Sequence, residues 1–175
     1  MPRALGIVIL LAVLATPAPA AEQRVPKTGK YFFRVTALKG FHTKTDTSGG
    51  MLIIPPASGQ HAMIYVGIVT DDKLRGQSDA DAAAGLAEKA AKAAGIDKVE
   101  KLVSERPPQI SNHNGLAFSG TIGAKPRYKR TAKIIIVRLA PDIFAQEWIV
   151  TQPGMGYVEF DLLNKALSNI ILTSE

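Results

Sequence analysis

Four cations and one aromatic ring crowd a six-residue segment of the chain. The segment contains Lys125, Arg127, Tyr128, Lys129 and Arg130. Arginine binds phosphate or carboxylate oxygens through paired hydrogen bonds, and tyrosine can stack on a ligand. Because the segment joins two predicted strands, we expect it at a hairpin tip. It is a candidate anion-binding surface, and the alternative is a solvated tip whose charge only keeps the protein soluble.

The three histidines, His42, His61 and His113, do not form a metal-binding pattern. His42 and Asp46 are four residues apart, but the glycines around them indicate a loop rather than one face of a helix. His113 stands among asparagines and a glycine, which favour a turn. The sequence therefore predicts neither a metal site nor a cofactor.

Ser119 is the one serine whose surroundings are reminiscent of a hydrolase nucleophile. A nucleophile elbow has glycine two residues before and two residues after the serine, at a sharp turn between a strand and a helix. Here those positions hold Ala117 and Thr121, within a strand-like run. A non-enzymatic role is therefore favoured, and enzymatic activity is left open.

The first twenty residues have the pattern of a secretory signal peptide. Arg3 supplies the positive start, residues 5–14 form an apolar run, and Ala18 and Ala20 give the small-x-small cleavage pattern. The run is too short to span a membrane, so we expect cleavage near Ala20–Ala21 and a periplasmic or secreted protein without a membrane span. Residues 21–30 are polar, with a proline and a glycine, and predict a flexible tether before one domain at 31–175.

Charge and cysteine content restrict the partners and the kinds of site that we expect for this protein. The 175 residues carry 21 Lys and Arg against 15 Asp and Glu, a net charge of +6, and no cysteine. An excess of positive charge favours an anionic envelope component or an acidic protein, while export argues against nucleic acid. Without cysteine the chain has no disulfide, no thiolate zinc site and no cysteine nucleophile, so an apolar core must hold the fold.

The order of the predicted elements indicates a mostly antiparallel sheet with two helices. Strands are predicted at 31–38, 51–54, 62–69, 99–104, 114–123, 132–139, 146–151 and 170–172, and helices at 79–94 and 158–168. The runs at 62–69 and 134–137 are apolar without alternation, which indicates central strands covered on both sides. We therefore predict an α+β fold, an α/β/α sandwich with helices on both faces of the sheet.

Local patterns place the helices and the aromatic residues. Ser78 and Asp81 have capping-box spacing before an alanine-rich helix. Phe160, Leu163 and Leu167 follow at helical spacing and predict the buried stripe of the second helix. Tyr65 and Trp148 lie in predicted strands, where packing is the favoured role and ligand stacking the alternative.

Together, the late meander containing Gly115–Gly120, the central strand 134–139, the strand with Trp148, the glycine-rich turn and the closing helix resemble the PsbP-like family. That family includes extrinsic subunits of the photosynthetic oxygen-evolving complex, a nuclear Ran-GTPase release factor and small exported bacterial proteins. The resemblance covers roughly residues 50–173 and implies an α/β/α sandwich with a binding or assembly role. It carries over no functional residue, because fold analogy alone does not fix function.

The sequence thus predicts an exported, non-enzymatic binding or accessory module that meets a protein or an anionic envelope component. The alternatives are a small exported hydrolase with an unrecognised site and a small-molecule carrier. Neither the partner nor the oligomeric state follows from the sequence.

Overall fold

The computed structural model describes residues 21–36, 38–56, 62–93, 96–122, 130–151, 155 and 157–175. Its strands are β1 (Glu22–Val25), β2 (Tyr31–Thr36), β3 (His42–Thr45), β4 (Met51–Ile54), β5 (Ala62–Thr70), β6 (Ile96–Lys101), β7 (Gln109–Ile110), β8 (His113–Asn114), β9 (Leu116–Ile122), β10 (Arg130–Ala140), β11 (Ile143–Thr151) and β12 (Ile170–Ser174). Its helices are α1 (Asp79–Ala93) and α2 (Tyr157–Ser168), with a short 3-10 turn at Asp72–Leu74. The predicted signal peptide, residues 1–20, lies outside the described ranges.

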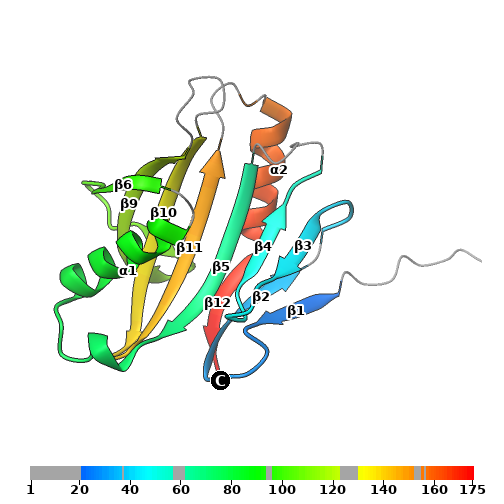
Figure 1. The fold of residues 1–175 in the computed structure, drawn as a ribbon. Coiled ribbons are helices and arrows are strands. Elements are labelled where there is room, and N and C mark those ends of the chain that lie inside the picture. The colour runs from blue at the N-terminus through cyan, green and yellow to red at the C-terminus, as the bar shows by residue number, and fades with distance from the viewer. Residues whose placement is uncertain are drawn as a thin grey trace, which may run out of the picture.

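The central sheet has seven strands in the order β3-β4-β5-β11-β10-β9-β6, and every neighbouring pair is antiparallel. The predicted meander forms β9, β10 and β11, and the unalternating runs form the inner strands β5 and β10 (Figure 1). The prediction of an α+β fold with a mostly antiparallel sheet is confirmed. Neither α1 nor α2, the helices of the described ranges, is long and apolar enough to span a membrane.

A second, three-stranded sheet, in the order β1-β2-β12, packs against the first. The predicted terminal strand at 170–172 forms as β12 but pairs with β2 instead of extending the central sheet. The tether predicted at 21–30 needs correction, because residues 22–25 form β1. Val25 is buried there, and the Arg24 guanidinium lies 3.9 Å from the centroid of the Phe32 ring and pairs with Glu175.

Helix α1 begins as its sequence predicts. The Ser78 Oγ accepts a hydrogen bond from the Asp81 backbone N–H at 3.1 Å and donates one to Asp81 Oδ2 at 2.6 Å. The buried side of the helix consists of small side chains around Leu86, namely Ala82, Ala83, Ala87 and Ala91. Small side chains let the helix lie close to β9 and β10 (Figure 1).

Helix α2 packs through a narrower stripe than predicted. Leu163 and Ala166 are buried and Leu167 is half-buried, whereas Phe160 in the first turn is 54% exposed. The contacts of α2 are with β5 and β12, and they gather around the second half of the helix. The strand predicted at 99–104 forms three residues earlier, as β6, and leaves Val103 97% exposed.

The core is divided by the central sheet into two apolar clusters. Alternating residues of β10 point to opposite sides, so that Ile134 and Ile136 join α1 in one cluster. Ile135 and Val137 join Leu163 of α2 and the three-stranded sheet in the other. Strand β11 follows the same alternation, and this sets the position of the candidate site.

Candidate functional site

The basic segment is described only at its last residue. Residues 123–129 lie outside the described ranges, and with them four of the five predicted anion-binding residues, Lys125, Arg127, Tyr128 and Lys129. Arg130 is the first residue of β10, half-buried and opposite Ile122 of β9. Anion binding by this segment therefore stays a prediction.

The described histidines lie apart from each other. His42 is exposed on β3 opposite Ile54, and His113 is exposed on β8 opposite Ile110, while His61 falls outside the described ranges. Among the described residues, no group of three or more His, Cys, Asp or Glu side chains gathers where it could hold a metal ion.

Asp46 organises the turn between β3 and β4. Its Oδ1 accepts hydrogen bonds from the backbone N–H groups of Ser48 and Gly50, and its Oδ2 accepts one from the Tyr65 hydroxyl at 2.8 Å. Burial alone would raise the pKa of Asp46, but hydrogen bonds from Ser48, Tyr65 and Gly50 outweigh it and lower the pKa. Asp46 therefore acts as a structural acceptor in the turn.

Ser119 lies inside β9, opposite Lys133 of β10 and Glu100 of β6. A nucleophile elbow requires a sharp turn from a strand into a helix, and a position in the middle of a paired strand does not provide one. The structure therefore agrees with the sequence, in which the residues around Ser119 do not match a nucleophile elbow.

Tyr65 and Trp148 contact each other across neighbouring strands. Their ring centroids are 5.3 Å apart with an interplanar angle of 56°, and both rings are half-buried. The Trp148 indole N–H donates to Gln146 Oε1 at 3.2 Å. Such tilted aromatic pairs stabilise the sheet, so these contacts agree with the packing role predicted for both rings.

Arg138 borders a cavity of about 130 Å³ beside α1, but structural contacts engage its guanidinium. Its Nη2 donates to the Gln77 carbonyl at 2.9 Å, and its Nε lies 3.0 Å from Asp79 Oδ1. The Phe144 ring centroid is 4.8 Å away. Arg138 therefore anchors the start of α1 to β10.

The residue that the sequence did not single out is Glu147 of β11. Glu147 is 8% exposed. Among the described residues, it is the one buried residue with an ionisable side chain. Its neighbours across the sheet are Val66 of β5 and Ile135 of β10, both buried and apolar. Burial of a carboxyl group between aliphatic residues is unfavourable, so its presence here calls for a function.

Glu147 is one of the residues that line an open groove with a volume of about 470 Å³. The other lining residues are neutral and come from the β7–β8 turn, the end of α2 and β12: Gln109, Ser111, Asn112, Leu167, Ser168, Ile170 and Ile171. One wall is fixed in place, because the Ser111 Oγ accepts a hydrogen bond from the Leu172 backbone N–H at 2.8 Å. The groove thus combines one carboxyl group with amide, hydroxyl and aliphatic surfaces.

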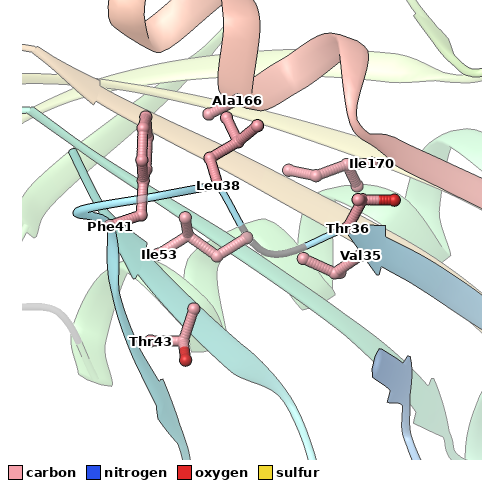
Figure 2. Close-up of a pocket in the computed structure, with 8 residues that line it drawn as sticks. All are labelled: Val35, Thr36, Leu38, Phe41, Thr43, Ile53, Ala166 and Ile170. Carbon is pink, nitrogen blue, oxygen red and sulfur yellow. The ribbon is translucent and has the colours of Figure 1, made fainter. Parts of the chain in front are cut away.

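A second pocket nearby has almost no room. Figure 2 shows the side chains that line it: Leu38 and Phe41 come from the connection between β2 and β3, and the others come from β2, β3, β4, α2 and β12. Its volume of about 10 Å³ is that of a site for one water molecule. This apolar pocket is therefore part of the core, and the Glu147 groove is the larger opening on the same side of the sheet.

Burial raises the pKa of Glu147 to about 7, although the positive charge of Lys133 acts in the opposite direction. Near neutral pH the carboxyl group can therefore be either protonated or ionised. When protonated it donates one hydrogen bond, and when ionised it accepts several and attracts a cation. Such groups are common in ligand-binding and catalytic sites.

The signal for Glu147 was present in the sequence. Gln146, Trp148 and Val150 share one face of their strand, so Glu147 must share the other face with Ile149. Because that face was also expected to be covered, the carboxyl group had to be buried. No sequence pattern predicted the groove itself, because its walls come from three segments that only the tertiary fold brings together.

No protein-family model matches the chain, and no curated protein matches it in sequence. Among solved structures, LpqN of Mycobacterium tuberculosis, described as involved in cell envelope biogenesis, matches with a TM-score of 0.50 and 13% identity. The match covers 87% of this chain and 91% of LpqN. At this identity it shows a shared fold.

Two further structures are similar. A protein from Bacteroides thetaiotaomicron matches 84% of this chain with a TM-score of 0.47 and 11% identity, and the match spans 48% of that protein's length. Cyanobacterial PsbP (CyanoP) from Synechocystis matches with a TM-score of 0.46 and 10% identity over 94% of this chain and 99% of its own. CyanoP, a protein of the kind that the sequence resembles, is thus among the solved structures similar to this chain.

Proposed function

We propose that this protein is an exported, non-enzymatic binding module that holds its ligand in the Glu147 groove. The observation that carries the proposal is a nearly buried glutamate in the lining of an open groove whose other lining residues are neutral. Ligand sites typically combine apolar walls with a small number of polar groups that fix orientation. The fold shared with LpqN, a protein of envelope biogenesis, is compatible with a role in the cell envelope.

The proposal includes three finer features. Residues 1–20 act as the signal peptide and direct the protein to the periplasm or the medium. The helices cover opposite faces of the central sheet as an α/β/α sandwich, which the division of β10 between two apolar clusters supports. The basic segment that contains Lys125, Arg127, Tyr128, Lys129 and Arg130 binds an anionic envelope component.

Nuclear magnetic resonance with a fragment library tests the groove. We expect fragments that carry a short apolar chain and one polar group to shift the backbone amide signals of Gln109, Asn112, Leu167 and Ile171. Leu167→Trp fills the groove and should abolish these shifts. The control Val103→Trp adds the same ring at a 97% exposed position and should leave them intact. Shifts that cluster elsewhere, or that survive Leu167→Trp, would contradict the proposal.

Retention on vesicles with anionic phospholipid tests the basic surface separately. Four cations of the basic segment are replaced by glutamine: Lys125, Arg127, Lys129 and Arg130. We expect weaker retention at low salt, since each lysine or arginine near an anionic surface contributes about 1 kcal/mol. The control replaces four exposed lysines elsewhere: Lys73, Lys89, Lys92 and Lys101. Equal retention of the two variants would show that the overall charge of the protein, and not the basic segment, causes binding to the vesicles.

A further inference from the structure

The chemistry of the Glu147 groove restricts the kind of ligand that it can hold. Glu147 is the one lining residue with an ionisable side chain. An ionised carboxylate that is 8% exposed has lost most of its water, and a cation that donates hydrogen bonds restores the lost stabilisation. A carboxylate or phosphate ligand would instead place two negative charges together. The groove therefore favours a positively charged nitrogen over an anion.

The aliphatic lining indicates what the nitrogen is attached to. Leu167 is half-buried, and Ile171 is 44% exposed at the edge of the groove. An alkyl chain lying over these side chains would remove apolar surface from water, at about 25 cal/mol per Å². The amide and hydroxyl groups of Gln109, Ser111 and Asn112 form the other side and can accept further N–H donors.

Cations stand on three neighbouring elements, and none of the three lines the groove. From β10, Lys133 acts on Glu147 and favours its ionised form, but it does not line the groove. From α2, Lys165 forms an ion pair with Asp161 at 2.7 Å. From β2, Arg34 lies opposite Ile171 in the strand pair. The strands β5, β7 and β12 contain no charged residue.

We infer that the groove binds an alkylammonium group, with its nitrogen at the Glu147 carboxylate and its carbon chain over Leu167 and Ile171. This inference rests on the proposed function, since it assigns a chemical class to the ligand of the same site. The group belongs either to a free amine or to a lysine side chain, because both present the same ammonium on a flexible chain.

Binding by this route releases a proton. In the free protein near pH 6 the carboxyl group holds a proton, because its pKa is about 7. The ammonium stabilises the carboxylate, so the proton leaves to the buffer as the complex forms. Amine affinity should therefore rise about tenfold between pH 6 and pH 8, as the ionised fraction of the free protein increases.

Isothermal titration calorimetry of the processed protein tests the inference, with n-pentylamine, n-pentanol and pentanoate as probes. At pH 8, where Glu147 is mostly ionised, we expect n-pentylamine to bind about tenfold more tightly than n-pentanol, and pentanoate not to bind, because a charge-assisted hydrogen bond contributes more than a neutral one. Titrations at pH 6 in two buffers of different ionisation enthalpy should reveal proton release. N-acetyl-lysine methylamide forms a second arm, and whichever amine binds more tightly identifies the source of the group.

Matched variants connect the preference to one carboxyl group. Glu147→Gln keeps the side-chain shape and should remove the preference for n-pentylamine together with the proton release. The control Glu88→Gln removes the same charge from an exposed position on α1 and should change neither. Equal binding of n-pentylamine and n-pentanol, or a preference that survives Glu147→Gln, would overturn the inference while leaving a binding groove. Fragments that bind nowhere in the groove would overturn the proposed function as well.

Discussion

The two faces of the central sheet differ in the openings that they leave. On the side of α1, small alanines pack with the large residues Ile134, Ile136 and Phe144, which are nearly inaccessible, and a cavity of about 130 Å³ remains beside Arg138. The apolar cluster on the other side contains Leu163 of α2 and residues of the three-stranded sheet. On that side lies an open groove of about 470 Å³ with the nearly buried Glu147 in its lining.

This difference separates stability from binding. A helix lined with alanine lies close to the sheet, and structural contacts engage Arg138 at the cavity on this side, so the face on the side of α1 serves mainly to hold the fold. The opposite face is assembled from segments far apart in sequence, and the space between them is bordered by polar side chains. A buried carboxyl group on that side weakens the fold when ionised, as expected of a residue kept for function.

Replacement of one isoleucine on the α1 side of the central sheet and of one that lines the groove should give the largest contrast. Ile134→Ala removes a fully buried side chain on the side of α1 and should lower the free energy of unfolding by about 2–5 kcal/mol. Ile171→Ala removes a side chain at the edge of the groove that is already 44% exposed, and should lower it by less than about 1 kcal/mol while weakening ligand binding. Urea unfolding measures the free energy of unfolding of both variants. Equal losses of stability would contradict the difference that we draw between the two regions.

The stability of the protein should depend on pH through Glu147. Its pKa in the folded protein, about 7, exceeds the ordinary value of 4.5 expected in the unfolded chain. The folded state therefore binds the proton more tightly, and stability should decrease as the pH rises from about 4.5 through about 7. Relative to Glu147→Gln, the protein should lose about 3 kcal/mol of stability between about pH 4 and about pH 8. A stability difference that does not change with pH would show that the carboxyl group is well solvated.

Much of the fold followed from local sequence patterns. The capping box of Ser78 and Asp81 and the apolar run of β10 act over a few residues, and both formed as predicted. The pairing of β12 with β2 was not predictable in this way, because either sheet could have accepted a short apolar strand. Phe160 fits the helical stripe but lies in the first turn of α2 and is exposed, since tertiary contacts rather than periodicity decide which part of a stripe is covered.

Less of the candidate site than of the fold could be predicted from the sequence. The alternation of β11 places Glu147 on a covered face, so its burial could have been predicted from Gln146 and Trp148 alone. The groove walls could not, because Ser111, Leu167 and Ile171 come together only through tertiary contacts. The basic segment was conspicuous in the sequence, yet most of it falls outside the described residues.

The central claim, that a buried carboxyl group equips the groove for a ligand, is tested most directly by titrating that group. Carbon-13 nuclear magnetic resonance of labelled glutamate, with Glu147→Gln to assign the signal, follows its ionisation. The account predicts a pKa of about 7 in the free protein, and a lower pKa when n-pentylamine is present. A pKa near the ordinary value of 4.5 that does not move with the amine would contradict it.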